Sequence, residues 1–353
     1  MRFLSNYPYV CTRVKAKKSL LIPKEDYSKM LMMETPQISR WLGETQYTRE
    51  INELSRKFSD VNLIENATYA NLARTYNDIL SYSNGKLKEM LSEYLKRWDI
   101  WNIKTILRGR LYGAKKEKIT EDLIPAGSFK MDFLDRLIES ESIDKIVDKT
   151  VEKFADTPSH DKLMNAGNEF KKTKSLMVFE DALDQAYYVN LQSKIRARGK
   201  PNKMLLGFIK KEVDMINLKL LFELKYEGLP AKEISKFLLP GGLELTERKL
   251  KHLSSLDTFK QFVSELKDYS FYDDIKNSIA EIDSTNSISS VILALDKHLL
   301  KFADRFSHIQ PLSVLPILSY LLLKKKEVDN IRIICRGKEF ELKNEEIKNL
   351  LVV

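Results

Sequence analysis

Histidines are the residues of this sequence best suited to metal binding or proton transfer, and there are four: His160, His252, His298 and His308. No two of them have the spacing of zinc ligands. None belongs to the His-Glu-x-x-His motif, which places two imidazoles and a general base on one helix face. We therefore expect the four histidines to lie on the surface or to cap helices, and not to bind a metal or act as a catalytic base.

Phosphate-binding loops and activated nucleophiles are also missing from the sequence. It holds neither the Gly-rich loop that ends in Gly-Lys-Ser/Thr nor the Gly-x-Ser-x-Gly turn of serine hydrolases. The two cysteines, Cys11 and Cys335, lie far apart without metal-ligand spacing, which predicts ordinary small apolar residues in a reducing compartment. We therefore expect no catalytic site, no cofactor and no metal.

Acidic residues belong to the strongest pattern of the chain, a signature that occurs three times. It reads acid, two residues, Asn, an aliphatic residue and a base. The copies carry the acids and asparagines Asp99 and Asn102, Asp214 and Asn217, Glu327 and Asn330, followed by the bases Lys104, Lys219 and Arg332. The asparagines are 115 and 113 residues apart. A fixed internal period indicates repeated structural units and argues against a single asymmetric active site.

The six acids and asparagines of the signature are predicted to be structural. Asn is a mediocre helix former, because its side chain competes for backbone hydrogen bonds. Its return at one register therefore suggests a specific side-chain hydrogen bond. The acid three residues earlier lies on the same helix face and is expected to reach the Asn, to bridge to a nearby base, or to cap a neighbouring helix.

The elements that carry the signature are expected to be helices. Around the second copy, apolar residues follow three- and four-residue steps from Leu206 to Leu220. Gly113 and Gly228 follow the first two copies as helix terminators. In residues 332–342, apolar side chains are spaced so that the segment resembles a short strand. The alignment of this segment with the other copies favours a helix. The sequence thus predicts an all-α protein.

The repeats divide the chain into three related units. We predict a lead-in helix at residues 1–22, then helical units at 23–127, 128–242 and 243–353. Hydrophobic residues make up 43% of the chain, which is enough to build a buried core and too much for a disordered chain.

Positive charge is in excess, with 59 basic and 50 acidic residues and a formal net charge of +9. The basic runs are residues 15–18, 171–174, 196–200 and 324–326. They fit either attraction to an anionic partner or solvated helix ends and faces, and the interspersed acids favour the second interpretation. Nucleic-acid binding stays as an alternative, although no known DNA- or RNA-binding motif is visible.

The longest apolar run covers residues 309–323 and is interrupted by Pro311 and Pro316. A membrane-spanning helix needs roughly 20 residues. The run is therefore predicted to be a buried helix, and no transmembrane segment is expected.

Several short motifs, in order, resemble a known family. They are Tyr9-Val10-Cys11-Thr12-Arg13-Val14-Lys15-Ala16, Thr45-Gln46-Tyr47, Ile124-Pro125-Ala126-Gly127, Leu239-Pro240-Gly241-Gly242 and the three signature copies. In these motifs the chain resembles the C subunit of archaeal and bacterial A/V-type rotary ATP synthases, which is called the d subunit in the eukaryotic proton pump. The motifs span nearly the whole length.

The resemblance implies an all-helical protein of three similar domains around a pseudo-threefold axis, shaped like a funnel. It implies a non-catalytic rotor subunit of the central stalk, which couples the membrane proteolipid ring to the shaft subunits D and F and transmits torque. One copy per complex is implied, monomeric when isolated, peripheral on the cytoplasmic face of the membrane, and binding no nucleic acid.

The bases of the signature are possible partner contacts. By pseudo-symmetry, Lys104, Lys219 and Arg332 are expected either to line the cavity that receives the shaft or to lie on the ordinary surface. Two other classes of function stay open: a helical repeat adaptor for an unrelated partner, and a nucleic-acid-binding protein that uses its diffuse basic charge.

Overall fold

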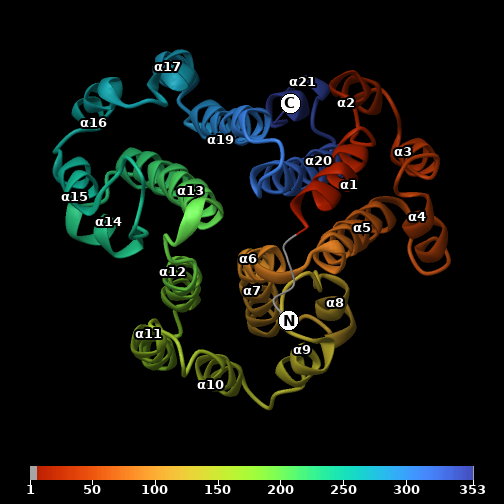
Figure 1. The fold of residues 1–353 in the computed structure, drawn as a ribbon, viewed down its shortest axis with the longest axis horizontal. Coiled ribbons are helices and arrows are strands. Elements are labelled where there is room, and N and C mark those ends of the chain that lie inside the picture. The colour runs from red at the N-terminus through yellow and green to blue at the C-terminus, as the bar shows by residue number, and fades with distance from the viewer. Residues whose placement is uncertain (1–5, 353) are drawn as a thin grey trace. The chain divides into compact units, whose positions relative to one another are not determined.

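The computed structural model describes residues 6–352, which form helices and loops with no strand among them (Figure 1). The prediction of an all-α protein is confirmed. The first five residues of the predicted lead-in and residue 353 of the predicted third unit lie outside the described residues.

The helices follow one another through short connections. In chain order they are α1 (Tyr7–Lys18), α2 (Lys24–Leu31), α3 (Thr35–Leu42), α4 (Thr48–Leu54), α5 (Asp60–Tyr82), α6 (Gly85–Leu95), α7 (Arg97–Leu111), α8 (Lys116–Glu121), α9 (Met131–Ile138), α10 (Ile143–Lys153), α11 (His160–Thr173), α12 (Leu176–Lys194), α13 (Gly199–Tyr226), α14 (Ala231–Phe237), α15 (Glu247–Ser255), α16 (Phe259–Glu265), the 3-10 turn η1 (Leu266–Asp268), α17 (Tyr272–Ala280), α18 (Ile282–Thr285), α19 (Ser289–Ile309), α20 (Leu315–Glu339) and α21 (Asn344–Asn349).

The three signature copies lie within α7, α13 and α20. The strand-like segment from residue 332 is helical as far as Glu339, so the choice of helix there is confirmed. Gly113 and Gly228 follow α7 and α13 with φ of 70° and 76°, in the left-handed region that glycine adopts at helix ends.

The apolar run at 309–323 is not one helix, contrary to the prediction. Helix α19 ends at Ile309 and α20 begins at Leu315, with Pro311 in the loop between them. Pro316 lies in the first turn of α20, where its missing N–H leaves no hydrogen bond unmade. None of the described helices combines the length and the apolar character that crossing a bilayer requires.

Two compact units share the described residues. The first contains Asn6 and residues 69–202, and the second contains residues 7–68 and 203–352. The first signature belongs to the first unit, and the other two belong to the second. The division into three repeat units with a lead-in remains a prediction.

Two apolar cores of the second unit each contain a signature helix. One packs residues of α13, including Met215, Leu218 and Phe222, against the helices that follow it up to α19. The other packs Ile331 and Ile334 of α20 with buried residues between positions 22 and 67. The signature helices are therefore central to the packing, with the apolar residues beside each Asn facing inward.

Both cysteines lie in the second unit, buried and free. Burial raises the pKa of Cys11 to about 11 and that of Cys335 to about 12. Both are therefore neutral thiols at ordinary pH.

Candidate functional site

Each signature Asn holds the backbone of one loop residue 22 positions further along the chain. The Asn102 Nδ2 donates to the Ile124 carbonyl and its Oδ1 accepts from the Ile124 N–H, both at 2.8 Å. Asn217 makes the same pair with Leu239, at 2.8 and 2.7 Å, and Asn330 makes it with Val352, both at 3.0 Å. All three asparagines are buried. Each one thus satisfies a buried backbone donor and acceptor at once.

The first two acids hold the segment that leads into the next helix. Asp99 accepts from the N–H groups of Ser128 and Phe129, at 3.0 and 2.8 Å, just before α9. Asp214 accepts from the N–H groups of Glu244 and Leu245, at 2.8 and 3.0 Å, just before α15. Burial raises the pKa of both carboxyls, while these hydrogen bonds oppose the rise.

Acid and Asn of one copy thus bind different segments of backbone. The direct contact between them that the sequence suggested is not formed within the described residues. Asn102, for example, uses its amide oxygen and nitrogen on Ile124, while Asp99 serves Ser128 and Phe129. The alternative interpretation, that the acid caps a neighbouring element, describes the geometry better.

The third acid performs the same task with a segment far away in sequence. Glu327 accepts from the Ile22 N–H at 2.5 Å, and Ile22 lies two residues before α2. Phe129 and Leu245 lie two residues before α9 and α15. Ile22 thus takes in the third copy the place of Phe129 and Leu245, a relation that the sequence motif did not reveal.

Glycine is required where the loop passes over the acid. A Cβ built on Gly127 would lie 2.1 Å from the Asp99 carboxylate, and one on Gly242 would lie 2.2 Å from that of Asp214. Real Cβ atoms do not approach other atoms so closely. The paired Pro-x-Gly turns of the sequence are thus explained by the need to bring backbone onto a buried carboxylate.

A fourth recurring residue was missed by the sequence analysis: a lysine three positions before each acid. Lys96, Lys211 and Lys324 repeat at the same 115- and 113-residue offsets as the asparagines. Lysine is so common in this chain that the recurrence did not stand out. Residues three apart share a helix face, which brings each lysine close to its acid.

Lys211 and Lys324 are buried and paired. The Lys211 Nζ lies 2.6 Å from the Glu244 carboxylate and 3.1 Å from the Ser270 hydroxyl. Although burial favours the neutral acid, Lys211 and Ser270 hold the pKa of Glu244 below its ordinary value. The Lys324 Nζ lies 2.8 Å from Glu327 and donates to the Tyr47 hydroxyl at 2.9 Å. The Tyr47 ring, 4.1 Å away, adds a cation–π contact.

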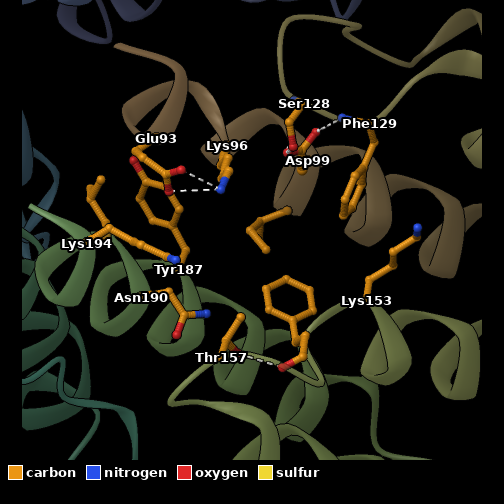
Figure 2. A pocket seen from close by; sticks show the side chains of 13 residues that line it. Glu93, Lys96, Asp99, Ser128, Phe129, Lys153, Thr157, Tyr187, Asn190 and Lys194 are labelled. Carbon is orange, nitrogen blue, oxygen red and sulfur yellow. Dashed lines mark hydrogen bonds and ion pairs between the residues drawn. The ribbon is translucent and has the colours of Figure 1, made fainter. Parts of the chain in front are cut away.

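Lys96 is different, because its side chain is 40% exposed against 2% for Lys211 and 0% for Lys324. It pairs with Glu93, one turn earlier, at 2.7 Å. Beside this pair is a cavity of about 130 Å³ in the first unit, shown in Figure 2. Its wall includes Asp99, Phe129 and Tyr187.

The bases of the signature are engaged in ion pairs inside their own units. Lys104 pairs with Asp184 of α12 at 2.6 Å, and Lys219 pairs with Asp296 of α19. Arg332 pairs with Glu65 of α5 at 3.1 Å. Each side chain remains between 20% and 28% exposed. Their predicted role at a partner interface therefore stays a prediction, with an intramolecular role added to it.

The acids around these bases differ between the units. In the first unit, burial and the neighbouring Asp184 raise the pKa of Asp181 to about 6, and Lys104 offsets only part of this rise. In the second unit, burial of Asp296 is outweighed by Lys326 and Lys219, which hold its pKa below the ordinary value. Nearby lysines thus outweigh the effect of burial at Asp296 but not at Asp181.

The basic run at 324–326 is not a solvated face, which corrects the interpretation from sequence for this run. Lys324 is fully buried, Lys325 pairs with Asp329, and Lys326 pairs with Asp296 at 2.6 Å. The acids lie in other turns and helices, so the linear run gave no sign of them.

His298 also departs from the surface position predicted for the histidines. It is buried, with its Nδ1 2.7 Å from Asp274. Burial lowers its pKa, and the hydrogen bond to Asp274 opposes that effect. Among the described residues, no group of three His, Cys, Asp or Glu side chains is placed to hold a metal.

Comparison with known proteins identifies the family of this chain. The family described as ATP synthase (C/AC39) subunit matches residues 10–350. Proteins named as the C subunit of A-type ATP synthase are similar over nearly their whole length. That of Methanosarcina acetivorans is 40% identical over 99% of this chain and 93% of its own. Those of Methanococcoides burtonii and Archaeoglobus fulgidus are 38% and 36% identical, over 99% and 98% of this chain and 95% and 96% of theirs. The chain belongs to the ATP synthase (C/AC39) subunit family.

Proposed function

We propose that this protein is the central-stalk coupling subunit of an A-type ATP synthase. It joins the proteolipid ring of the membrane sector to the shaft subunits D and F and transmits torque between them. The family assignment makes it a structural subunit and not an enzyme. The proposal places one copy in each complex, peripheral on the cytoplasmic face, with three similar domains forming a funnel-shaped socket.

The observation that carries this proposal is the recurrence of one hydrogen-bonded joint in α7, α13 and α20. In each, an Asn holds a loop backbone through two hydrogen bonds, and an acid accepts from backbone N–H just before a helix, which is the next helix but one along the chain for Asp99 and Asp214 and is α2 for Glu327. A part that transmits torque must resist deformation, and closely packed interiors with satisfied polar groups have low compressibility. A built catalytic site would instead be expected to occur once.

The signature bases supply the proposed contacts with the shaft. Arg332 supports this role best, because with Lys326 and Arg336 it lines a hollow of about 320 Å³ in the second unit. Lys104 and Lys219 are proposed as its counterparts. The net charge of +9 is proposed to favour acidic loops of the ring, so ring binding should weaken as salt is raised.

A charge swap separates the two roles of these bases. Lys104→Asp with Asp184→Lys keeps the internal ion pair but inverts the charge at the position of the base. If Lys104 contacts the shaft, the double variant keeps its melting temperature and loses affinity for purified D and F subunits. Unchanged shaft binding by such swaps at all three bases would remove the interface assignment.

The proposed function is tested by recovery of the assembly. The chain is tagged at its C-terminus and expressed in its own host. Membranes are then solubilised in mild detergent, and the copurifying proteins are identified by mass spectrometry. Recovery of the proteolipid ring together with D and F is expected. Recovery of nucleic acid, or of soluble proteins alone, would replace this proposal with the nucleic-acid or repeat-adaptor alternative.

A further inference from the structure

The cavity beside Lys96 has a mixed lining that suits a short acidic group. Ile100, Phe129, Phe154 and Leu191 supply apolar walls. Figure 2 shows Lys96 and Glu93 on one side and Lys153 on another. The volume of about 130 Å³ is close to the roughly 150 Å³ of a protein cavity that holds benzene. A Glu or Asp side chain fits in such a space.

The second copy shows what occupies the equivalent place when the site is complete. Glu244 and Phe129 both follow their signature acid by 30 residues and give their backbone N–H to it. The second copy has one more donor in this segment, Leu245, which lies two residues before α15 as Phe129 lies two residues before α9. Glu244 provides the carboxylate that neutralises Lys211. In the first copy the residue at that spacing is Phe129, which carries no charge, and Lys96 pairs with Glu93, one turn earlier.

The charge around the cavity is also unbalanced, with positive charge in excess. Three lysines line it, namely Lys96, Lys153 and Lys194. Within the described part of the chain, neither Lys153 nor Lys194 forms an ion pair. Of the two acids in the lining, Glu93 is shared with Lys96, and Asp99 is occupied by Ser128 and Phe129. The cavity therefore favours an incoming anion.

We propose that this cavity is a docking socket for a carboxylate side chain of a partner polypeptide, which meets Lys96 as Glu244 meets Lys211. The inference rests on the proposed function in one respect: the partner belongs to the same assembly. The apolar walls receive the methylene groups of the side chain, and Lys153 and Lys194 attract it from the rim.

Zero-length crosslinking tests this proposal in the intact complex. A carbodiimide activates a carboxylate, and a contacting lysine amine displaces the activating group to form an amide, so only touching pairs are joined. Peptide mass spectrometry should show Lys96 joined to a carboxylate of another polypeptide in the complex, and to Glu93 in the isolated chain. Coupling to Glu93 alone in both samples would overturn the proposal.

Two variants of one residue give a matched comparison. Phe129→Glu supplies the missing carboxylate within the chain, so Lys96 should couple to position 129 and its intermolecular crosslink should fall about fivefold, the effect of a partly exposed ion pair. Phe129→Leu removes the ring without adding charge and should keep that crosslink. Equal crosslinking in both variants would contradict the proposed role of Lys96.

A second measurement works even if no complex is recovered. N-acetylglutamate amide is added to the isolated chain, and acylation of lysines by an activated ester is followed residue by residue. Lys96 should be protected, while Lys88, an exposed lysine of α6 outside the cavity, should react as before.

Absence of protection of Lys96 would overturn the socket. Protection without a copurified complex would leave the socket standing and count against the proposed function alone. Protection without a Lys96 crosslink in a recovered complex would overturn the polypeptide partner.

Discussion

Lys96 and Lys324 occupy the same position of the repeat, yet their surroundings are opposite. Lys324 is inaccessible to solvent and lies between Glu327 and Tyr47. Lys96 is 40% exposed and faces a cavity. The Asn joints beside them are the same in all three copies. The repeat thus keeps its backbone joints and varies the side chains that enclose the lysine, so stability and recognition need not depend on the same residues.

The largest expected effect on stability comes from replacing Lys324, the buried lysine of this pair. Lys324→Met leaves the Glu327 carboxylate buried without its cation, which should cost about 3–5 kcal/mol of unfolding free energy. Urea unfolding followed by circular dichroism measures it. The double variant Lys324→Met/Glu327→Gln removes both charges and should recover a large part of the loss. A cost as small as that of Lys96→Met would contradict the comparison.

The Asn joints should show equal costs in all copies. Asn217→Leu leaves the Leu239 N–H and carbonyl unpaired and should lower stability by about 1–3 kcal/mol. Asn102→Leu and Asn330→Leu should act alike, whereas Asn168→Leu on the exposed face of α11 should be nearly neutral. An unchanged melting temperature for Asn217→Leu would show that the joint is dispensable.

The acids beside the bases should respond to pH in opposite directions. The pKa of Asp181 is raised to about 6, so the folded state favours its protonated form, and this stability is lost as pH rises through about 6. Asp181→Asn should therefore add about 1 kcal/mol at pH 7, after allowance for solvent screening.

Asp296 provides the opposite case for the same measurement. Because its folded pKa is lowered, it contributes stability above its unfolded pKa, which is lost as pH falls through the folded value. Asp296→Asn should therefore destabilise the protein at pH 7. Melting curves from about pH 2 to about pH 8 compare both variants with the parent. If the melting temperatures of both variants shift in the same direction at pH 7, the proposed contrast between Asp181 and Asp296 is wrong.

The smallest effect is expected at the exposed lysine. Lys96→Met removes only a partly exposed ion pair with Glu93 and should change stability by less than about 0.5 kcal/mol, as should Lys88→Met. Differential scanning calorimetry of both variants provides the comparison. A loss of several kcal/mol for Lys96→Met alone would show that Lys96 is as structural as Lys324.

Much of this architecture is predictable from sequence because it repeats. The helices around Asn102, Asn217 and Asn330 follow from apolar spacing and a fixed period. What binds each Asn does not follow, because a side chain can reach backbone at any distance along the chain. The carbonyl of Ile124 lies in a turn whose only sequence signal is Pro-x-Gly.

Charge environments were the least predictable part. Lys324 belongs to a run of three lysines that is typical of a solvated surface, and its partners Glu327 and Tyr47 come from its own helix and from a residue 277 positions away. The role of Lys211 depends on Glu244, whose counterpart in the first copy is Phe129. This difference can be read from the aligned copies, but its effect on the lysines appears only in three dimensions.

The hydrogen bond from Ile22 to Glu327 has a consequence for how the chain folds. It joins residues 305 positions apart, and the same core includes Ile38, Leu42 and Ile334. A ribosome releases α2, α3 and α4 long before α20, so the apolar surface that they share with α20 lacks this partner until α20 is made. Contacts of such high sequence separation form slowly and leave the early segment open to aggregation or chaperone binding. During synthesis, the first helices of this protein therefore cannot complete their core until α20 has been made.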